Sequence, residues 1–238
     1  MTGSPPGFPR AVVFDLFGTL VDAPTREDRA HAAARISAVA QVPPAVAERV
    51  LAGSWAERHD GRLPTTEALG AYLWERCGRT GPVPAELPAL LARLAAPRLA
   101  ADPAVLSVID GLRRGGTRIG VLSDASADIA DAWPRTGLAG LADTAVFSCR
   151  AGAVKPAAAL YAAVLTDLGA EPAAALFCGD GGGDELRGAE AAGMRAVRVE
   201  RRGGAGTMAF GERPWPGPSL QGVEQLPAFL AGRTGGTR

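Results

Sequence analysis

Two carboxylates, one hydroxyl and one ammonium group stand at points of this chain where the neighbouring sequence has no need of them. Asp15, Ser123 and Asp180 each end or follow a short apolar run, and Lys155 is the only lysine among 238 residues that otherwise use arginine. A carboxylate is costly to remove from water, so its place beside an apolar run calls for an explanation. Together these four groups suit metal-assisted phosphoryl transfer.

Each group has a distinct role in that chemistry. Asp15 and Asp180 would hold Mg²⁺, a hard cation that proteins bind through one or two carboxylates together with phosphate oxygens. Asp15 would also attack phosphorus to give an aspartyl-phosphate. Ser123 and nearby backbone N–H groups would bind the phosphoryl oxygens, and Lys155 would neutralise the charge that builds up. Taken singly, each residue has an ordinary alternative as a turn, cap or surface residue.

The elements around these residues predict how they meet. The apolar run 11–14 before Asp15 is typical of a strand buried on both faces of a parallel sheet. From residue 102 onward, apolar strands alternate with helices, which indicates βαβ units. Because the carboxyl ends of parallel strands share one edge, the polar groups should converge there. The predicted strands are 118–122, 143–147, 174–178 and 195–199, and the helices are 103–114, 126–133, 156–168, 185–192 and 223–230.

The region 22–97 has a different character. It is rich in Ala, Leu, Arg and Glu and has helical periodicity without a strand signal. We predict a small helical domain, residues 22–97, inserted after the first strand of an α/β core domain that comprises residues 1–21 and 98–238. The helices expected in the insertion are 27–40, 44–57, 67–77 and 85–95.

Composition narrows the classes of function. The net charge is zero, so neither nucleic acid nor a membrane surface is an expected partner, and no apolar stretch approaches the length of a spanning helix. The first residues lack the pattern of a signal peptide, and three cysteines without metal-type spacing are typical of reduced thiols in a cytoplasmic protein. We expect a small-molecule substrate and a monomer or homodimer.

Four ordered motifs resemble those of the haloacid dehalogenase (HAD) superfamily. They are DLFGTL beginning at Asp15, VLS ending at Ser123, KP beginning at Lys155, and GDGGGDE beginning at Gly179. The similarity covers nearly the whole chain, and the helical region lies where this family carries a C1-type cap. The resemblance implies a HAD-like hydrolase with a Rossmann-like parallel-sheet core, an inserted all-helical cap, Mg²⁺ and Asp15 as nucleophile.

The same resemblance suggests a set of site residues. The metal ligands would be Asp15, Asp180 and the backbone carbonyl of Phe17, with Asp184 and Glu185 behind them. The catalytic residues would be Asp15 and Lys155, and the phosphate-binding residues would be Ser123, Asp124, Gly18 and Thr19.

Phe17 departs from the pattern of the family's phosphatases, which usually carry a second aspartate at this position. That aspartate protonates the leaving group, and losing a general acid typically costs about 10²–10⁴-fold in rate. A leaving group that needs no proton, such as an acyl phosphate's carboxylate, would tolerate the change. The alternatives are a 2-haloacid dehalogenase, whose halide leaves without a proton, and a non-catalytic HAD-fold binding protein. A milder departure is Asp124, where asparagine is usual.

The cap should close over the site and contact the substrate. Trp55 and Arg58 lie near a predicted break between helices and are the candidates for this contact. The alternative is that Trp55 packs inside the cap and Arg58 faces solvent.

Overall fold

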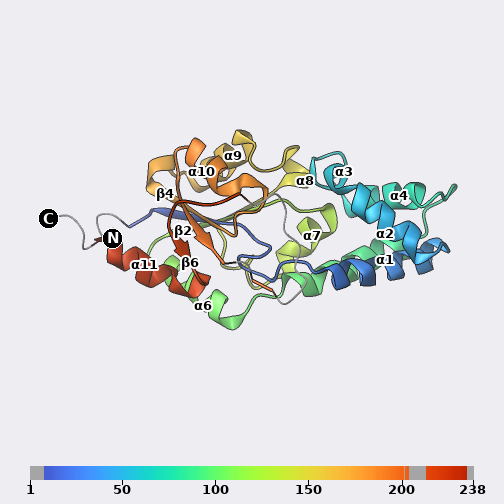
Figure 1. Cartoon of the computed structure of the whole chain (residues 1–238), viewed down its shortest axis with the longest axis horizontal. Coiled ribbons are helices and arrows are strands. Elements are labelled where there is room, and N and C mark those ends of the chain that lie inside the picture. The colour runs from blue at the N-terminus through green and yellow to red at the C-terminus, as the bar shows by residue number, and fades with distance from the viewer. Residues whose placement is uncertain (1–7, 201, 204–212, 235–238) are drawn as a thin grey trace.

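The chain folds around one parallel sheet. The computed structural model describes residues 8–200, 202–203 and 213–234, and within them six strands lie in the order β3-β2-β1-β4-β5-β6 (Figure 1). All five strand pairs are parallel, as the alternation of elements predicts. The strands are β1 Ala11–Phe14, β2 Arg118–Ser123, β3 Thr144–Phe147, β4 Ala175–Gly179, β5 Arg195–Val199 and β6 Ser219–Leu220.

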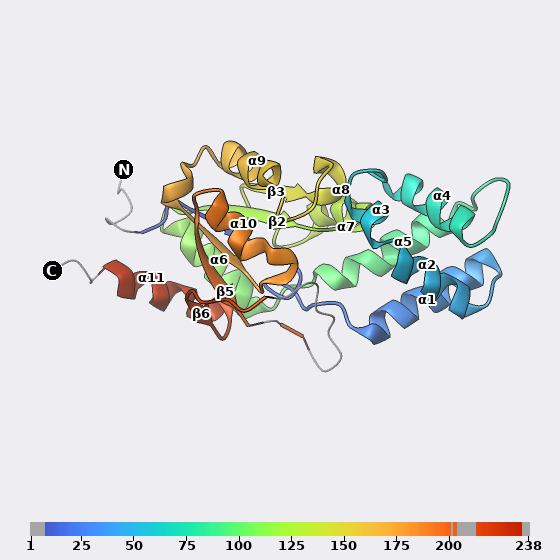
Figure 2. The ribbon, with the colours of Figure 1, turned by 45° about the horizontal axis from the view of Figure 1, so that its top comes forward.

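Helices cover both faces of the sheet and extend beyond one end of it (Figures 1 and 2). The α-helices are α1 Arg26–Ala40, α2 Pro44–Gly53, α3 Trp55–His59, α4 Thr66–Arg76, α5 Glu86–Ala95, α6 Pro103–Arg114, α7 Ala127–Ala132, α8 Ser148–Ala151, α9 Ala158–Leu168, α10 Glu185–Ala191 and α11 Leu226–Thr234. None of the helices in the described ranges is both long enough and apolar enough to cross a membrane.

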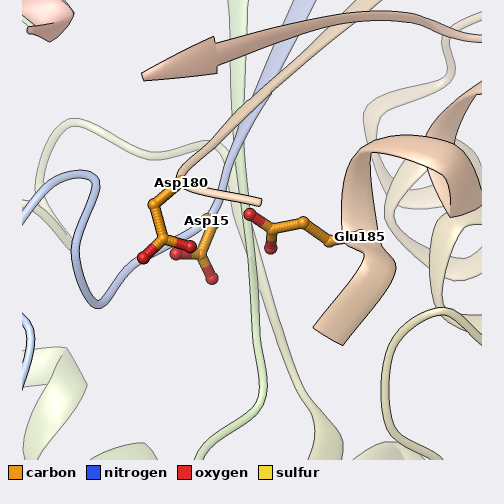
Figure 3. Close-up of side chains that lie close together, drawn as sticks. All are labelled: Asp15, Asp180 and Glu185. Carbon is orange, nitrogen blue, oxygen red and sulfur yellow. The ribbon is translucent and has the colours of Figure 1, made fainter. Parts of the chain in front are cut away.

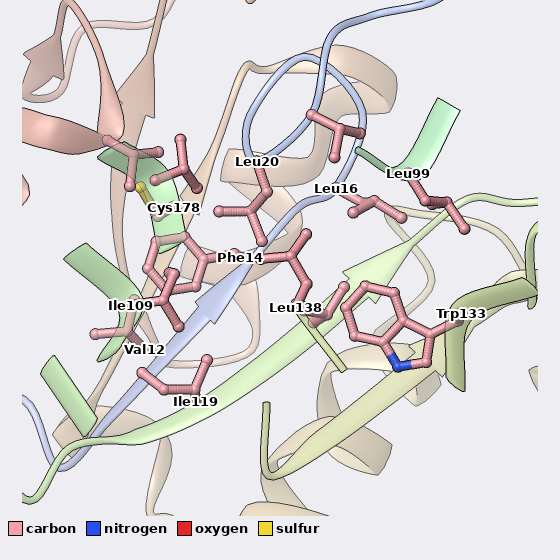
Figure 4. Close-up of a cluster of buried hydrophobic side chains, with 14 of the residues drawn as sticks. Val12, Phe14, Leu16, Leu20, Leu99, Ile109, Ile119, Trp133, Leu138 and Cys178 are labelled. Atoms are coloured by element: carbon pink, nitrogen blue, oxygen red, sulfur yellow. The ribbon is translucent and has the colours of Figure 1, made fainter. Parts of the chain in front are cut away.

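Two apolar layers bury the sheet. On one face α6, α7 and α11 pack over side chains such as Val12 and Phe14, and on the other face α9 and α10 pack over Val13 and Phe177. Figure 4 shows the first of these layers, where Phe14 and Ile109 from α6 meet. Because β1 lies between β2 and β4 in the middle of the sheet, the residue that follows it is held from both sides.

The helices α1–α5, which we call the cap, follow β1 and precede α6. They share a hydrophobic cluster of their own, which includes Ile36, Leu73 and Leu87. In Figure 2 they lie beyond one end of the sheet. This agrees with the predicted α/β core with a helical insertion, while the limits at residues 22 and 97 stay a prediction.

One cap helix differs from the prediction. The helix expected over 44–57 is broken at Ser54, which takes a non-helical backbone conformation (φ −117°, ψ 22°) between α2 and α3. Gly53 precedes it, and glycine is a poor helix former. The Ser54 hydroxyl also accepts a hydrogen bond from Arg58 Nε at 3.2 Å, which favours the break.

Elements of the core also differ from the prediction, and β6 and α9 are two of them. Strand β6 was not predicted, because two residues are too short to show an alternating pattern. Helix α9 begins at Ala158, so Pro156 lies outside it and the prediction of a helix from 156 was two residues too long.

A polar contact holds the cap against the core. The carboxylate of Asp131 in α7 accepts hydrogen bonds from the backbone N–H and the hydroxyl of Thr66 at 3.1 and 2.5 Å. Arg150 on α8 forms an ion pair with the other oxygen of Asp131. Thr66 is the first residue of α4, so this contact fixes the start of that helix relative to the sheet.

Candidate active site

Asp15 lies at the carboxyl end of the central strand, where the sheet itself positions it. Its backbone N–H donates to the carbonyl of Cys178 in β4 at 2.9 Å. Its side chain is buried, and its two oxygens face different partners: Lys155 Nζ lies 2.5 Å from Oδ1, and the Thr19 hydroxyl donates to Oδ2 at 3.2 Å. The parallel strands therefore bring Lys155 to Asp15 across 140 residues of chain.

Two further carboxylates join Asp15. Oxygen atoms of Asp15, Asp180 and Glu185 all lie within 4.8 Å of one another, and the three residues are buried. Figure 3 shows that Asp15 and Asp180 extend from neighbouring strand ends, while Glu185 reaches toward them from the start of α10. Lys155 forms ion pairs with both Asp15 and Glu185.

One ammonium group does not offset this negative charge. Burial raises the pKa of Asp15 to about 6, and the charge of Asp180 adds to the effect although Lys155 opposes it. Burial likewise raises the pKa of Glu185 to about 8, with Asp15 adding to it. Burial alone would lower the pKa of Lys155, but the surrounding carboxylates raise it well above its usual value. Lys155 therefore keeps its positive charge, and this single positive charge faces three carboxyl groups.

The donor set fits a hard divalent cation. Both oxygens of Glu185 already have protein partners, since Oε1 accepts from the Gly181 N–H at 2.9 Å and Oε2 is bound by Lys155. Asp180 has one oxygen that accepts from the Gly182 N–H at 2.9 Å. Asp15 and Asp180 extend from neighbouring strand ends and would bind Mg²⁺ directly, with Glu185 behind them.

Ser123 and Asp124 lie at the end of β2 and line the same cavity as Asp15. No residue in the described part of the chain hydrogen-bonds the Ser123 hydroxyl, so it is free for a ligand. One carboxylate oxygen of Asp124, Oδ1, accepts a hydrogen bond from the Lys155 backbone N–H at 3.0 Å. Burial raises the pKa of Asp124.

Three of the candidate residues, Gly18, Thr19 and Asp184, do not line the cavity. The Gly18 N–H donates to the carbonyl of Val21 at 2.8 Å, and Thr19 is fully buried with its hydroxyl on Asp15, so neither lines the cavity. Asp184 faces Arg187 and Arg213, with closest distances of 3.5 and 3.3 Å, rather than the other carboxylates. Phe17 lines the cavity next to Asp15.

A cavity of about 770 Å³ extends from these groups into the cap. Trp55 and Arg58 both line it, as does His59, so the cap helix α3 faces the site. The rings of Trp55 and His59 stack with their centroids 4.6 Å apart. Burial lowers the pKa of His59 to about 3, and the neighbouring charge of Arg58 adds to this effect.

The family follows from a comparison with known sequences. A model of the haloacid dehalogenase-like hydrolases matches residues 9–193. The chain belongs to this family of hydrolases. No curated protein sequence matches it.

Solved structures of HAD proteins share the fold. The HAD phosphatase from Thermococcus onnurineus is 20% identical with a TM-score of 0.65, covering 94% of this chain and 98% of that chain. An L-2-haloacid dehalogenase from Xanthobacter autotrophicus is 24% identical with a TM-score of 0.64, covering 94% and 99%. A HAD family enzyme from Bacteroides thetaiotaomicron, solved with magnesium and inorganic phosphate, is 17% identical with a TM-score of 0.63, covering 83% and 97%. These likenesses support the fold and leave the reaction of this HAD hydrolase open.

No sequence pattern indicated three of the arginines that line the cavity of this HAD hydrolase. They are Arg29 on α1, Arg93 on α5, and Arg98 in the short turn after α5. The guanidinium of Arg98 lies over the Phe17 ring, 4.9 Å from its centroid. The one available signal was the position of Arg98 after Pro97, where the chain returns from the cap to the core.

Proposed function

We propose that this HAD hydrolase is a Mg²⁺-dependent phosphatase that acts on a small phosphorylated metabolite through an aspartyl-phosphate intermediate. The observation that carries the proposal is the buried group of Asp15, Asp180 and Glu185 with one lysine, open to a cavity. Such a surplus of oxygen ligands and negative charge favours a divalent cation. We further propose that the protein works in the cytoplasm.

The residues of the chain suggest how the reaction would proceed. An oxygen of Asp15 attacks phosphorus, the bond from phosphorus to the leaving oxygen breaks, and the leaving group departs with the electron pair. Lys155 holds Asp15 in place and offsets negative charge beside the phosphoryl group, while the free Ser123 hydroxyl donates to a phosphoryl oxygen. Bound Mg²⁺ would offset phosphoryl charge and bring the two anions together. Water then attacks phosphorus, which releases phosphate and regenerates the Asp15 carboxylate.

Phe17 limits the kinds of leaving group that the site can expel. Its ring can neither give a proton to a departing alkoxide nor take one from water. A carboxylate leaves an acyl phosphate without needing a proton, so an acyl phosphate suits this site better than an alkyl phosphate. Asp124 lines the cavity and accepts from the Lys155 N–H, and its carboxyl group is the one we propose to assist the water.

Phosphate release tests the proposal. Acetyl phosphate and phenyl phosphate are offered with 5 mM Mg²⁺ or with EDTA, and inorganic phosphate is measured. We expect Mg²⁺-dependent release that is faster for acetyl phosphate. Asp15→Asn should lower kcat/KM by roughly 10³-fold or more, whereas Asp110→Asn on the outer surface of α6 should leave it unchanged. Equal rates for wild-type protein and Asp15→Asn would exclude Asp15 as the nucleophile.

Phe17 also favours a second candidate, a 2-haloacid dehalogenase. In that reaction Asp15 attacks the carbon that carries the halogen, the carbon–halogen bond breaks, and halide leaves with the electron pair and no proton. Water then hydrolyses the resulting ester. Chloride release from 2-chloropropionate that persists in EDTA would favour this activity, and its absence together with Mg²⁺-dependent phosphate release would exclude it. Binding of a phosphate analogue without either turnover would indicate a non-catalytic relative.

A further inference from the structure

The cavity is negative at the core end and positive at the cap end. Resting on the proposed phosphatase function, we propose that the substrate carries a second anionic group, a carboxylate or a second phosphate, which Arg58 and Arg98 bind at the cap end. The structure thus points to a substrate with two anionic ends and an apolar body between them.

Arg58 is the first support. It lies on α3 and lines the cavity, and its guanidinium hydrogen bonds go to the Ser54 hydroxyl at 3.2 Å and the Leu51 carbonyl at 3.0 Å. Both acceptors are neutral. They orient the guanidinium but leave its charge unpaired, and burial lowers the pKa of Arg58 to about 10. An arginine in such surroundings is normally paired with an anion.

Arg98 is the second support. Its guanidinium stacks over Phe17, and no carboxylate in the described part of the chain forms an ion pair with it. Arg98 is exposed to solvent, although the surrounding protein atoms lower the pKa of its guanidinium. The stacking leaves the donor edge of the guanidinium free, and that edge matches the two oxygens of a carboxylate or phosphate.

Nearby acids offset this positive charge only in part. Arg29 adds a third positive group at the same end of the cavity. Two carboxylates, Asp28 and Asp128, face these arginines and favour the charged form of Arg98, but their two negative charges do not balance three positive ones. Neither is in ion-pair contact with an arginine among the described residues. The cap end of the cavity therefore has a positive charge that a ligand can neutralise.

The part of the cavity wall that the cap forms is rich in apolar side chains. Side chains from several cap helices line it, which suits an alkyl or aromatic body. The apolar lining residues from the cap include Ile36, Leu51, Leu69, Leu73 and Leu91.

Three phosphonates that cannot be hydrolysed test the inference by calorimetric titration in the presence of Mg²⁺. They are benzylphosphonate, 4-carboxybenzylphosphonate and p-xylylenediphosphonate. We expect one or both of the second and third to bind at least 10-fold more tightly than the first, because a charge-assisted hydrogen bond contributes this much. The probe that gains more identifies the second anion as a carboxylate or a phosphate.

Two variants and one matched control locate the effect. Arg58→Gln and Arg98→Gln should each lose most of the 10-fold advantage while keeping the affinity for benzylphosphonate, which also shows that the variant is folded. Arg35→Gln, an exposed arginine on α1 that does not line the cavity, should keep the advantage. Equal binding of all three phosphonates by wild-type protein, or an advantage that survives in both variants, would overturn the inference.

A fourth probe, 4-methylbenzoate, separates this inference from the proposed function. If no phosphonate binds but 4-methylbenzoate binds to wild-type protein and not to Arg58→Gln or Arg98→Gln, the anion site at the cap is supported and the phosphate site is wrong. If benzylphosphonate binds and neither added anion helps, the phosphate site stands and the anion site at the cap is wrong.

Discussion

Replacing Lys155 by methionine is the sharpest test of how the buried carboxylates are held. The side chain of Lys155 is only 5% exposed, and those of its partners Asp15 and Glu185 are 7% and 1% exposed. Methionine fills a similar volume but has no charge. Lys155→Met therefore removes the ammonium ion that offsets these carboxylates while keeping most of the packing.

The cost follows from the burial of the pair. Removing one partner of a buried ion pair is destabilising by about 3–5 kcal/mol. Two carboxylates lose their partner, but the cost does not double, because one can take up a proton. Glu185 is the one that would do so, since its pKa is already raised to about 8. For a chain of this size each kcal/mol lowers Tm by about 2–4 °C, so we expect a decrease of roughly 6–20 °C.

Urea unfolding followed by circular dichroism at pH 8, in EDTA, measures this loss. The matched control is Arg114→Met, whose partner Asp110 lies 2.9 Å away but whose side chain is 73% exposed. Such a surface pair contributes about 0–1 kcal/mol. If Lys155→Met lowers the free energy of unfolding no more than Arg114→Met does, the carboxylates do not depend on the ammonium ion and the reasoning is wrong.

Three further predictions concern metal, pH and the cap. Mg²⁺ at 100 times its Kd should stabilise the wild-type protein by about 2.7 kcal/mol, raising Tm in a thermal melt; Asp180→Asn should lose this rise and Asp184→Asn should keep it. The pKa of His59 is about 3 in the folded chain against 6.5 ordinarily, so its contribution is complete above pH 6.5 and is lost as pH falls toward 3. At pH 5 the loss is about 2 kcal/mol; urea unfolding should show a shallower decline for His59→Gln, and a decline like the wild type's for exposed His31→Gln. Asp131→Ala removes the acceptor at the start of α4 and should speed amide hydrogen exchange there by 10-fold or more; unchanged exchange would show that this contact does not hold the cap.

The core could be predicted from sequence because its signals are local. An apolar run that ends in a polar residue indicates a strand and its carboxyl end, and parallel pairing then brings such ends to one edge. This is how Asp15, Asp180 and Lys155 could be placed together although they lie far apart in the chain. The structure brings these residues into contact or close to it, while their roles in a reaction stay proposals.

The cap end of the cavity could not be predicted in the same way. Helical periodicity shows which face of a helix is apolar, but not which other element lies against it. The approach of Arg98 to Phe17 depends on how the chain returns from the cap to the core, and no local pattern encodes that path. The sequence predicts Glu185 behind the metal but does not predict its ion pair with Lys155. That ion pair depends on how α10 begins after the glycines 181–183.

Phe17, which departs from the family pattern, is in contact with Arg98, which has no ion pair among the described residues. An aspartate at position 17 would lie within reach of the Arg98 guanidinium, which is now 4.9 Å from the centre of the Phe17 ring. The two would form an ion pair, and the arginine would no longer be available to a ligand. Phenylalanine instead offers an aromatic face, which attracts the cation without using its hydrogen-bond donors. The loss of an acid at position 17 thus leaves the Arg98 guanidinium free to bind the second anionic group that we propose for the substrate.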